Sequence, residues 1–143
     1  MDMRVAESLI ETGFSEERER IMQVRYTVFV EEQGVPESLE NDEKDPLCRH
    51  ALLLMDDRPV ATGRLEGDGH IGRIAVIRSM RGKGLGSRIV TFLEAKAKAR
   101  GLHRVYLGAQ LQAIPFYEKL GYRSYGPAFM DAGIAHRYME KAI

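Results

Sequence analysis

The chain has 143 residues, 44% of them apolar and 29% charged, which is expected of one globular domain spanning residues 1–143. Lys plus Arg and Asp plus Glu each total 21, and a formal charge of zero argues against nucleic acid as a partner. No apolar run approaches the roughly 20 residues of a membrane span, residues 1–7 lack the long apolar core of a secretory signal, and Cys48 is the only cysteine. We therefore expect a cytoplasmic protein with no membrane partner and no internal disulfide.

The first third of the chain predicts a strand, a helix and a loop. The strand is expected over residues 4–9. Ser15 is expected to cap the helix, whose first turn holds Glu16 and Glu17, and the helix is expected to end near Pro36. The acidic stretch 37–45 predicts a solvated loop with at most one helical turn, and a role facing the substrate is the alternative.

The rest of the chain alternates apolar segments with turn residues and two helical patterns. We expect strands over 51–55, 60–65, 71–76, 103–107, 122–125 and 135–139, and helices over 85–97 and 113–120. The first three of these strands follow one another directly, so they pair as antiparallel hairpins, whereas the later helix over 85–97 is a crossover. The fold class is therefore α/β (α+β), with a mixed, mostly antiparallel twisted sheet of about six or seven strands and helices on both faces.

The segment Arg81-Gly82-Lys83-Gly84-Leu85-Gly86 lies between an apolar strand and the longest helical pattern. Unpaired N–H groups and the helix dipole attract phosphate to a helix N-terminus, and glycine lets the backbone approach closely. A merely tight connection is the structural alternative. A P-loop requires G-x-x-x-x-G-K-[ST] and a dinucleotide fingerprint requires G-x-G-x-x-G, and the spacing here fits neither. The segment is predicted to bind the phosphates of a nucleotide-type coenzyme.

Two motifs in order carry a family resemblance. The pattern R-x-x-G-x-G begins at Arg81, after a strand that ends at Val76, and the segment 113–122 (AIPFYEKLGY) follows about 30 residues later. Together they resemble the GNAT superfamily of acetyl-CoA-dependent N-acetyltransferases. The segments 28–36, 42–45 and 133–136 extend the resemblance over most of the chain, to a small bacterial subgroup often labelled YjcF- or ElaA-like.

The resemblance implies a V-shaped cleft beside the strand that ends at Val76, with acetyl-CoA as co-substrate. Backbone groups of Ile74 and Val76 would bind the pantetheine arm, and Val76 N–H would polarise the thioester carbonyl. Gln110 either lines the cleft or only hydrogen-bonds the strand end, and Gly108 replaces a side chain that is usually polar or imidazole in the subgroup. The coenzyme-binding residues expected in full are Ile74, Ala75, Val76, Arg81, Gly82, Lys83, Gly84, Leu85, Gly86, Ser87, Gln110 and Tyr117.

Acyl transfer from a thioester to an amine needs a proton donor for the departing thiolate and a neutral amine. By resemblance Tyr117 is the donor, with packing of its ring as the structural alternative. Many members place a glutamate early in the fourth strand, but residues 70–73 hold no carboxylate. We therefore expect Glu32 and His136 as bases. The alternatives are Glu31, Glu66 and His70, or an acceptor acidic enough to need no base.

The expected function is acetyl transfer from acetyl-CoA to a primary amine of an unidentified small-molecule or peptide acceptor, by direct attack. No group of His, Asp and Glu has ligand spacing, so no metal is expected. The alternative is a non-catalytic coenzyme-A-binding sensor or interaction protein. Superfamily members of this size are often dimers, so a homodimer is one expected form.

Overall fold

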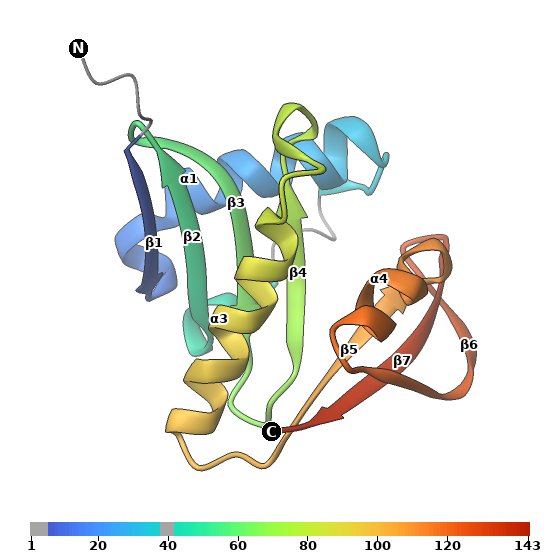
Figure 1. The fold of residues 1–143 in the computed structure, drawn as a ribbon. Helices are drawn as coiled ribbons and strands as arrows, with labels where there is room; N and C mark the ends of the chain where they lie inside the picture. The colour runs from blue at the N-terminus through green and yellow to red at the C-terminus, as the bar shows by residue number, and fades with distance from the viewer. Residues whose placement is uncertain (1–5, 38–41) are drawn as a thin grey trace.

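The computed structural model describes residues 6–37 and 42–143, which form two antiparallel sheets and the helices packed on them (Figure 1). The sheets have the strand orders β1-β2-β3-β4 and β5-β7-β6. No helix in these two ranges is long and apolar enough to span a membrane. The elements are β1 (Glu7–Thr12), α1 (Phe14–Arg25), the π-helix η1 (Tyr26–Glu32), η2 (Asp45–Leu47), β2 (Arg49–Met55), β3 (Arg58–Leu65), β4 (Ile71–Val76), η3 (Arg78–Met80), α3 (Leu85–Ala99), β5 (Arg104–Gln110), η4 (Leu111–Ala113), α4 (Ile114–Lys119), β6 (Arg123–Asp131) and β7 (Ile134–Ala142).

The first sheet is covered on both faces, with α1 behind it and α3 in front in Figure 1. Successive side chains of a strand point to opposite faces. Leu52 of β2 therefore packs in a cluster with Ile21 of α1, whereas its neighbour Leu53 packs in the main core with Ile89 and Leu93 of α3. Burial on both faces explains the uninterrupted apolar run in β2.

The segment from α1 into η1 begins and ends differently from the prediction. Gly13, not Ser15, is the N-cap, because the Glu16 carboxylate accepts a hydrogen bond from Gly13 N at 2.7 Å. Within the described residues the first strand covers Glu7–Thr12 and so continues beyond the predicted end at residue 9, and residues 4 and 5 of the predicted range lie outside the described residues. At Tyr26 the α-helix passes into η1, a change of hydrogen-bond pattern that apolar spacing did not reveal.

The acidic stretch was predicted to be a solvated loop, and this is wrong for Asp45. Its carboxylate is fully buried and accepts hydrogen bonds from Arg25 Nη1 at 2.9 Å and Arg64 Nη1 at 3.0 Å. Although burial alone would raise the pKa of Asp45, the two guanidinium groups hold it below its usual value. Residues 38–41 of the stretch lie outside the described residues. Beside this pair, burial raises the pKa of the Cys48 thiol to about 11, so the thiol stays protonated.

Among the described residues, the strands of the two sheets are hydrogen-bonded to each other at one end. His70 and Tyr106 form a single parallel bridge, and Tyr106 N donates to Gly69 O at 3.1 Å. A Cβ on Gly69 would lie 2.5 Å from Arg104 O, so only glycine lets the β3–β4 turn approach β5 this closely. From this joint β4 and β5 diverge, as Figure 1 shows. The predicted mixed, mostly antiparallel sheet is thus confirmed, with its strands divided into two sheets.

Candidate active site

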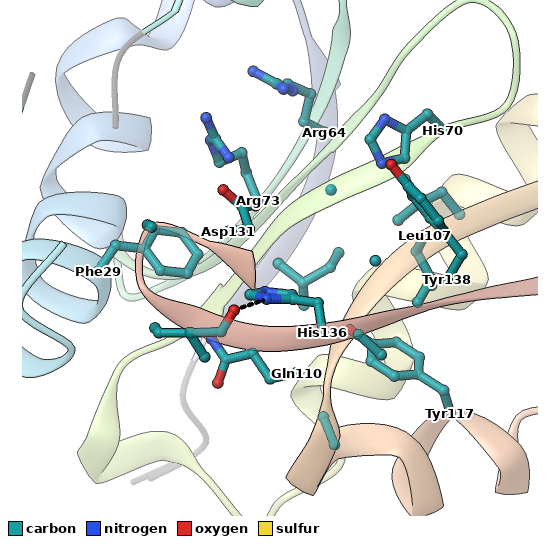
Figure 2. Close-up of a pocket in the computed structure, with 18 of the residues that line it drawn as sticks. Phe29, Arg64, His70, Arg73, Leu107, Gln110, Tyr117, Asp131, His136 and Tyr138 are labelled. Carbon is teal, nitrogen blue, oxygen red and sulfur yellow. Dashed lines mark hydrogen bonds between the residues drawn. The ribbon is translucent and has the colours of Figure 1, made fainter. Parts of the chain in front are cut away.

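A cavity of about 340 Å³ lies between the diverging strands. One wall is formed by residues 71–74 of β4 and the other by residues 107–110 of β5. The end of η1, α4 and the β6–β7 hairpin contribute most of the remaining lining, and Figure 2 shows side chains from these elements converging on one space. Among the predicted site residues, the cavity is lined by Ile74, Gln110, Tyr117 and His136.

The end of β4 presents backbone groups toward the gap. Ile77 N donates to Val60 O at 3.0 Å, and Ala61 pairs with Val76 one step further along the ladder. Hydrogen-bonded and non-hydrogen-bonded pairs alternate between antiparallel strands, so Val76 N–H and C=O point away from β3. Ala75 is different: it is buried, and its backbone faces Thr62 of β3. Of these two predicted coenzyme contacts, only Val76 has backbone groups on the side of the cleft.

A bulge in β4 precedes this end. The register with β3 shifts between Thr62 and Arg64, and Arg73 has a φ of 51°. A left-handed residue inside a strand is uncommon and breaks the ladder locally. Arg73 lines the cavity, and its guanidinium donates to Asp42 at 3.2 Å. The bulge therefore bends β4 beside the cavity.

The glycine-rich loop surrounds the N-terminus of α3, outside the cavity lining. Gly82 and Gly84 both have a φ of 78°, and an added Cβ at either position would meet nothing within 4 Å. Arg88 N donates to Gly84 O at 3.1 Å in the first turn of α3, so the preceding N–H groups are those that a helix leaves without intrahelical partners. Lys83 is exposed, Ser87 is half-buried and Leu85 is buried in the main core. The loop has the geometry of an anion site.

Glu32, which we expected to act as a base, lies outside the cavity lining. Its carboxylate accepts two hydrogen bonds from Arg81, from Nη1 at 2.5 Å and from Nη2 at 2.7 Å. The bond to Arg81 holds the pKa of Glu32 below its usual value, so the carboxylate is a poor proton acceptor. The same ion pair turns the Arg81 guanidinium toward η1. Glu31, one residue earlier, is exposed and also lies outside the cavity lining.

Tyr117 lies in the cavity wall contributed by α4 (Figure 2). Burial raises the pKa of its hydroxyl to about 12. Within the described ranges its hydroxyl makes no hydrogen bond, and its ring packs edge to face against Phe116 and Tyr122. A buried phenol of this kind stays protonated and can donate a hydrogen bond to a group in the cavity.

His136 of β7 lies opposite Gln110 of β5 and also lines the cavity. Its Nδ1 is 2.7 Å from Ile134 O, drawn as the dashed line in Figure 2. A carbonyl oxygen only accepts, so in the neutral ring Nδ1 carries the hydrogen and Nε2 has the free lone pair. Phe129 stacks against the ring with a centroid separation of 5.7 Å. His136 therefore has the tautomer of a proton acceptor.

A second imidazole, that of His70, also lines the cavity, and the sequence predicted it only as an alternative base. His70 Nδ1 lies 2.5 Å from Glu66 Oε2, and the ring stacks on Tyr106 with a centroid separation of 4.8 Å. Glu66 in turn lies within 3.8 Å of Arg64 Nη2 and 3.5 Å of Lys44 Nζ. The spacing E-x₃-H from Glu66 to His70 was the signal in the sequence that could have identified this pair, because the tight turn between them brings the two positions together.

An aromatic wall completes the cavity on the second sheet. Phe129 and Tyr138 stack with a centroid separation of 4.6 Å. A Cβ on Gly108 would lie 3.3 Å from Phe129 Cζ, so a side chain at this position would displace the Phe129 ring. Gly108, a departure from the subgroup pattern, thus permits Phe129 to lie against β5.

Residues 12–143 match the acetyltransferase (GNAT) domain family. The chain belongs to the GNAT acetyltransferase family. The Bacillus subtilis protein named uncharacterized N-acetyltransferase YjcF is 42% identical over 122 residues, covering 82% of this chain and 87% of that protein. Membership makes this chain an N-acetyltransferase with a coenzyme A thioester as co-substrate.

Solved structures agree with this assignment. Escherichia coli ElaA is 26% identical, with a TM-score of 0.84 over 95% of this chain and 99% of ElaA. An acyl-CoA N-acyltransferase from Pseudomonas aeruginosa has a TM-score of 0.85 over 96% of this chain and all of its own, at 24% identity, and supports the fold alone. The predicted resemblance to the YjcF- and ElaA-like subgroup is confirmed. The comparisons give no support to the non-catalytic alternative.

Proposed function

We propose that this protein transfers the acetyl group of acetyl-CoA to a primary amine by direct attack in the cavity between β4 and β5. The observation that carries the proposal is the divergence of these strands, which exposes Val76 N–H beside a cavity lined by Tyr117 and His136. The acceptor is a small-molecule or peptide amine, and the proposed location is the cytoplasm.

The coenzyme occupies two regions in this proposal. Its diphosphate lies on the loop 81–87, where N–H groups at the start of α3 and the charge of Lys83 stabilise the anion. Its pantetheine arm runs beside Ile74 and Val76 into the cavity. The left-handed Gly82 and Gly84 support this placement, because they keep the loop backbone free of side chains. Ala75 contributes to the wall by packing and not by a polar contact.

Attack by the amine converts the thioester carbonyl to a tetrahedral oxyanion, and Val76 N–H donates a hydrogen bond to this oxygen. The attack forms the C–N bond, and collapse of the intermediate re-forms the carbonyl and breaks the C–S bond, which leaves an amide and a thiolate. An alkyl thiol has a pKa near 8.5. Since the pKa of Tyr117 is about 12, the hydroxyl stabilises the leaving thiolate chiefly as a hydrogen-bond donor. Complete proton transfer from Tyr117 to sulfur would be uphill.

The nitrogen must lose a proton during this sequence, and His136 Nε2 accepts it. The hydrogen bond from Nδ1 to Ile134 O supports this role, because it fixes both the tautomer and the ring orientation. Glu32, our other expected base, is not proposed for this step because Arg81 occupies both of its oxygens.

The proposal is tested by two measurements on the parent chain. Thermal unfolding with acetyl-CoA and with adenosine as a control tests whether the coenzyme binds, since a ligand that binds only the folded state raises Tm. Release of the coenzyme thiol is then followed across a panel of primary amines. We expect a Tm increase with acetyl-CoA and amine-dependent thiol release. Binding without turnover on any amine would instead favour the non-catalytic alternative.

A further inference from the structure

The end of η1 contacts both walls of the cleft through two consecutive residues. Glu32 reaches the loop that follows β4, and Gln33 reaches the last residue of β5. Gln33 and Gln110 line the cavity, whereas Glu32 and Arg81 lie outside its lining, on the side of the glycine-rich loop. The last residue of η1 and the residue that caps it therefore span the open end of the cleft.

Glu32 contacts the β4 side through the guanidinium group of Arg81, all three nitrogens of which donate hydrogen bonds. Arg81 Nη1 and Nη2 each donate to a different oxygen of Glu32, and Arg81 Nε donates to Val76 O at 3.0 Å. A bidentate pair fixes the plane of the guanidinium as well as its position. Glu32 thereby orients the Val76 peptide carbonyl through Arg81. The N–H of that same residue faces the cleft.

The contact with the β5 side is made by amides. Gln110 Nε2 donates to Gln33 Oε1 at 3.0 Å, and Gln112 Nε2 donates in turn to Gln110 Oε1 at 2.5 Å. Gln110 is the last residue of β5, where this strand lies farthest along from the joint with β4. The Gln33 bond therefore holds the free end of the second wall.

The helical end that bears both residues is itself fixed. Gln33 N donates to Val28 O at 3.1 Å and Val35 N donates to Phe29 O at 2.8 Å, so the wide turns of η1 close on themselves. Val28 packs in a buried cluster with Ala75 of β4, and Phe29 lies against that cluster. π-Helical turns are rare and are often found at functional sites. Here the wide turn places Glu32 and Gln33 toward different strands.

We propose that Glu32 and Gln33 form a clamp that sets the separation of β4 and β5 where acetyl-CoA enters. They are positioning residues: Glu32 acts through Arg81 on the loop and on Val76, and Gln33 acts through Gln110 on the end of β5. This inference rests on the proposed function, since it requires the coenzyme to lie in this cleft. It also gives Glu32 a role that its ion pair permits.

The test is isothermal titration of acetyl-CoA into the parent and matched variants, with Tm of the free proteins measured in parallel. Glu32→Gln keeps the shape of the side chain and loses its charge, and we expect an increase of about tenfold in Kd. Gln33→Ala should raise Kd about threefold. Arg81→Lys should raise Kd about as much as Glu32→Gln does. The double variant with both of these substitutions should have a Kd little higher than that of either single variant, because both substitutions break the same ion pair.

Glu31→Gln and Gln23→Ala, at exposed positions with the same chemistry, serve as controls and should bind as the parent does. The free Tm of the clamp variants should stay within about 3 °C of the parent, since an exposed ion pair adds little stability. Parent-like affinity in both Glu32→Gln and Gln33→Ala overturns the clamp alone. Weaker binding that accompanies a drop in Tm greater than about 5 °C also overturns it. A parent that binds no acetyl-CoA overturns the clamp and the proposed function together.

Discussion

Tyr117 and Tyr122 lie edge to face, with ring centroids 5.8 Å apart, yet only the Tyr122 hydroxyl has a hydrogen-bond partner within the described part of the chain. Tyr122 Oη donates to the buried Glu94 at 2.7 Å, whereas the Tyr117 hydroxyl belongs to the cavity wall. Two neighbouring phenols therefore have different tasks. One satisfies a buried carboxylate and the other is available to a ligand.

Removing each hydroxyl should separate these tasks. Tyr117→Phe should lower kcat about 10- to 100-fold with little change in KM for acetyl-CoA, because the lost hydrogen bond acts on the leaving thiolate. Tyr122→Phe should leave kcat unchanged and destabilise the fold by about 1–3 kcal/mol, because Glu94 loses a buried partner. Steady-state kinetics and urea unfolding measure the two effects. An unchanged kcat in Tyr117→Phe would refute its role.

Gly84 should be essential for coenzyme binding for reasons beyond backbone strain. Gly84→Val places a branched side chain where phosphate must approach and should abolish the rise in Tm caused by acetyl-CoA. Gly126→Val is the matched control, because Gly126 has a φ of 72° and an added Cβ there would also meet nothing within 4 Å. Both variants should lose about 1–3 kcal/mol of stability from the left-handed conformation. If Gly84→Val keeps the full ligand-induced shift, the loop is not the phosphate site.

The base is assigned by comparing the two imidazoles of the cavity. His136 Nε2 has the free lone pair that can accept the amine proton, so in His136→Gln kcat should drop at least about tenfold. His70→Gln should keep a kcat close to that of the parent. Steady-state measurement of kcat decides the question, and a drop in His70→Gln alone would transfer the role to the pair of His70 and Glu66.

Asp45 should dominate the acid sensitivity of the fold. Its pKa is lowered in the folded state, so its contribution is present above the unfolded value of about 4 and is lost as pH falls through the folded value. Asp45→Asn should cost about 3–5 kcal/mol at pH 7, because Arg25 and Arg64 each lose one buried carboxylate that accepts their hydrogen bonds. The difference in Tm from the parent should shrink below about pH 4. Asp57→Asn, at an exposed turn, should show neither effect.

Local patterns predicted most elements because their causes are local. The apolar run in β2, the stripe of α3 and the turn residues Asp56 and Asp57 each specify structure through neighbours in the chain. Both aspartates adopt positive φ in the hairpin turn, with values of 50° and 64°. Strand ends were less predictable. β6 extends through Pro127 because the register shift between Tyr125 and Phe129 removes the demand for a hydrogen bond there.

The site was predictable where a motif spaces its own residues, and not where distant segments meet. The loop at Arg81 and the helix at Tyr117 follow recognisable spacings. Whether Glu32 faces the cavity depends on a π-helical turn and on an arginine 49 positions away. Asp45 had every sign of a surface residue in sequence, because its partners Arg25 and Arg64 lie 20 and 19 residues away. Long-range charge pairing leaves no periodic trace.

The two sheets can pivot about Gly69, whose carbonyl accepts a hydrogen bond from β5. Beyond this contact, the six residues of β4 extend for about 20 Å. A pivot of about 5° at the Gly69 contact would shift the far end of β4 by about 1.7 Å, roughly the length of one carbon–carbon bond. We therefore expect the range of acyl groups and amines that the cleft admits to depend on how easily the two sheets pivot. The hydrogen bond from Tyr106 N to Gly69 O resists such a pivot at the end of the cleft farthest from the coenzyme loop, and the clamp of Glu32 and Gln33 resists it at the opposite end.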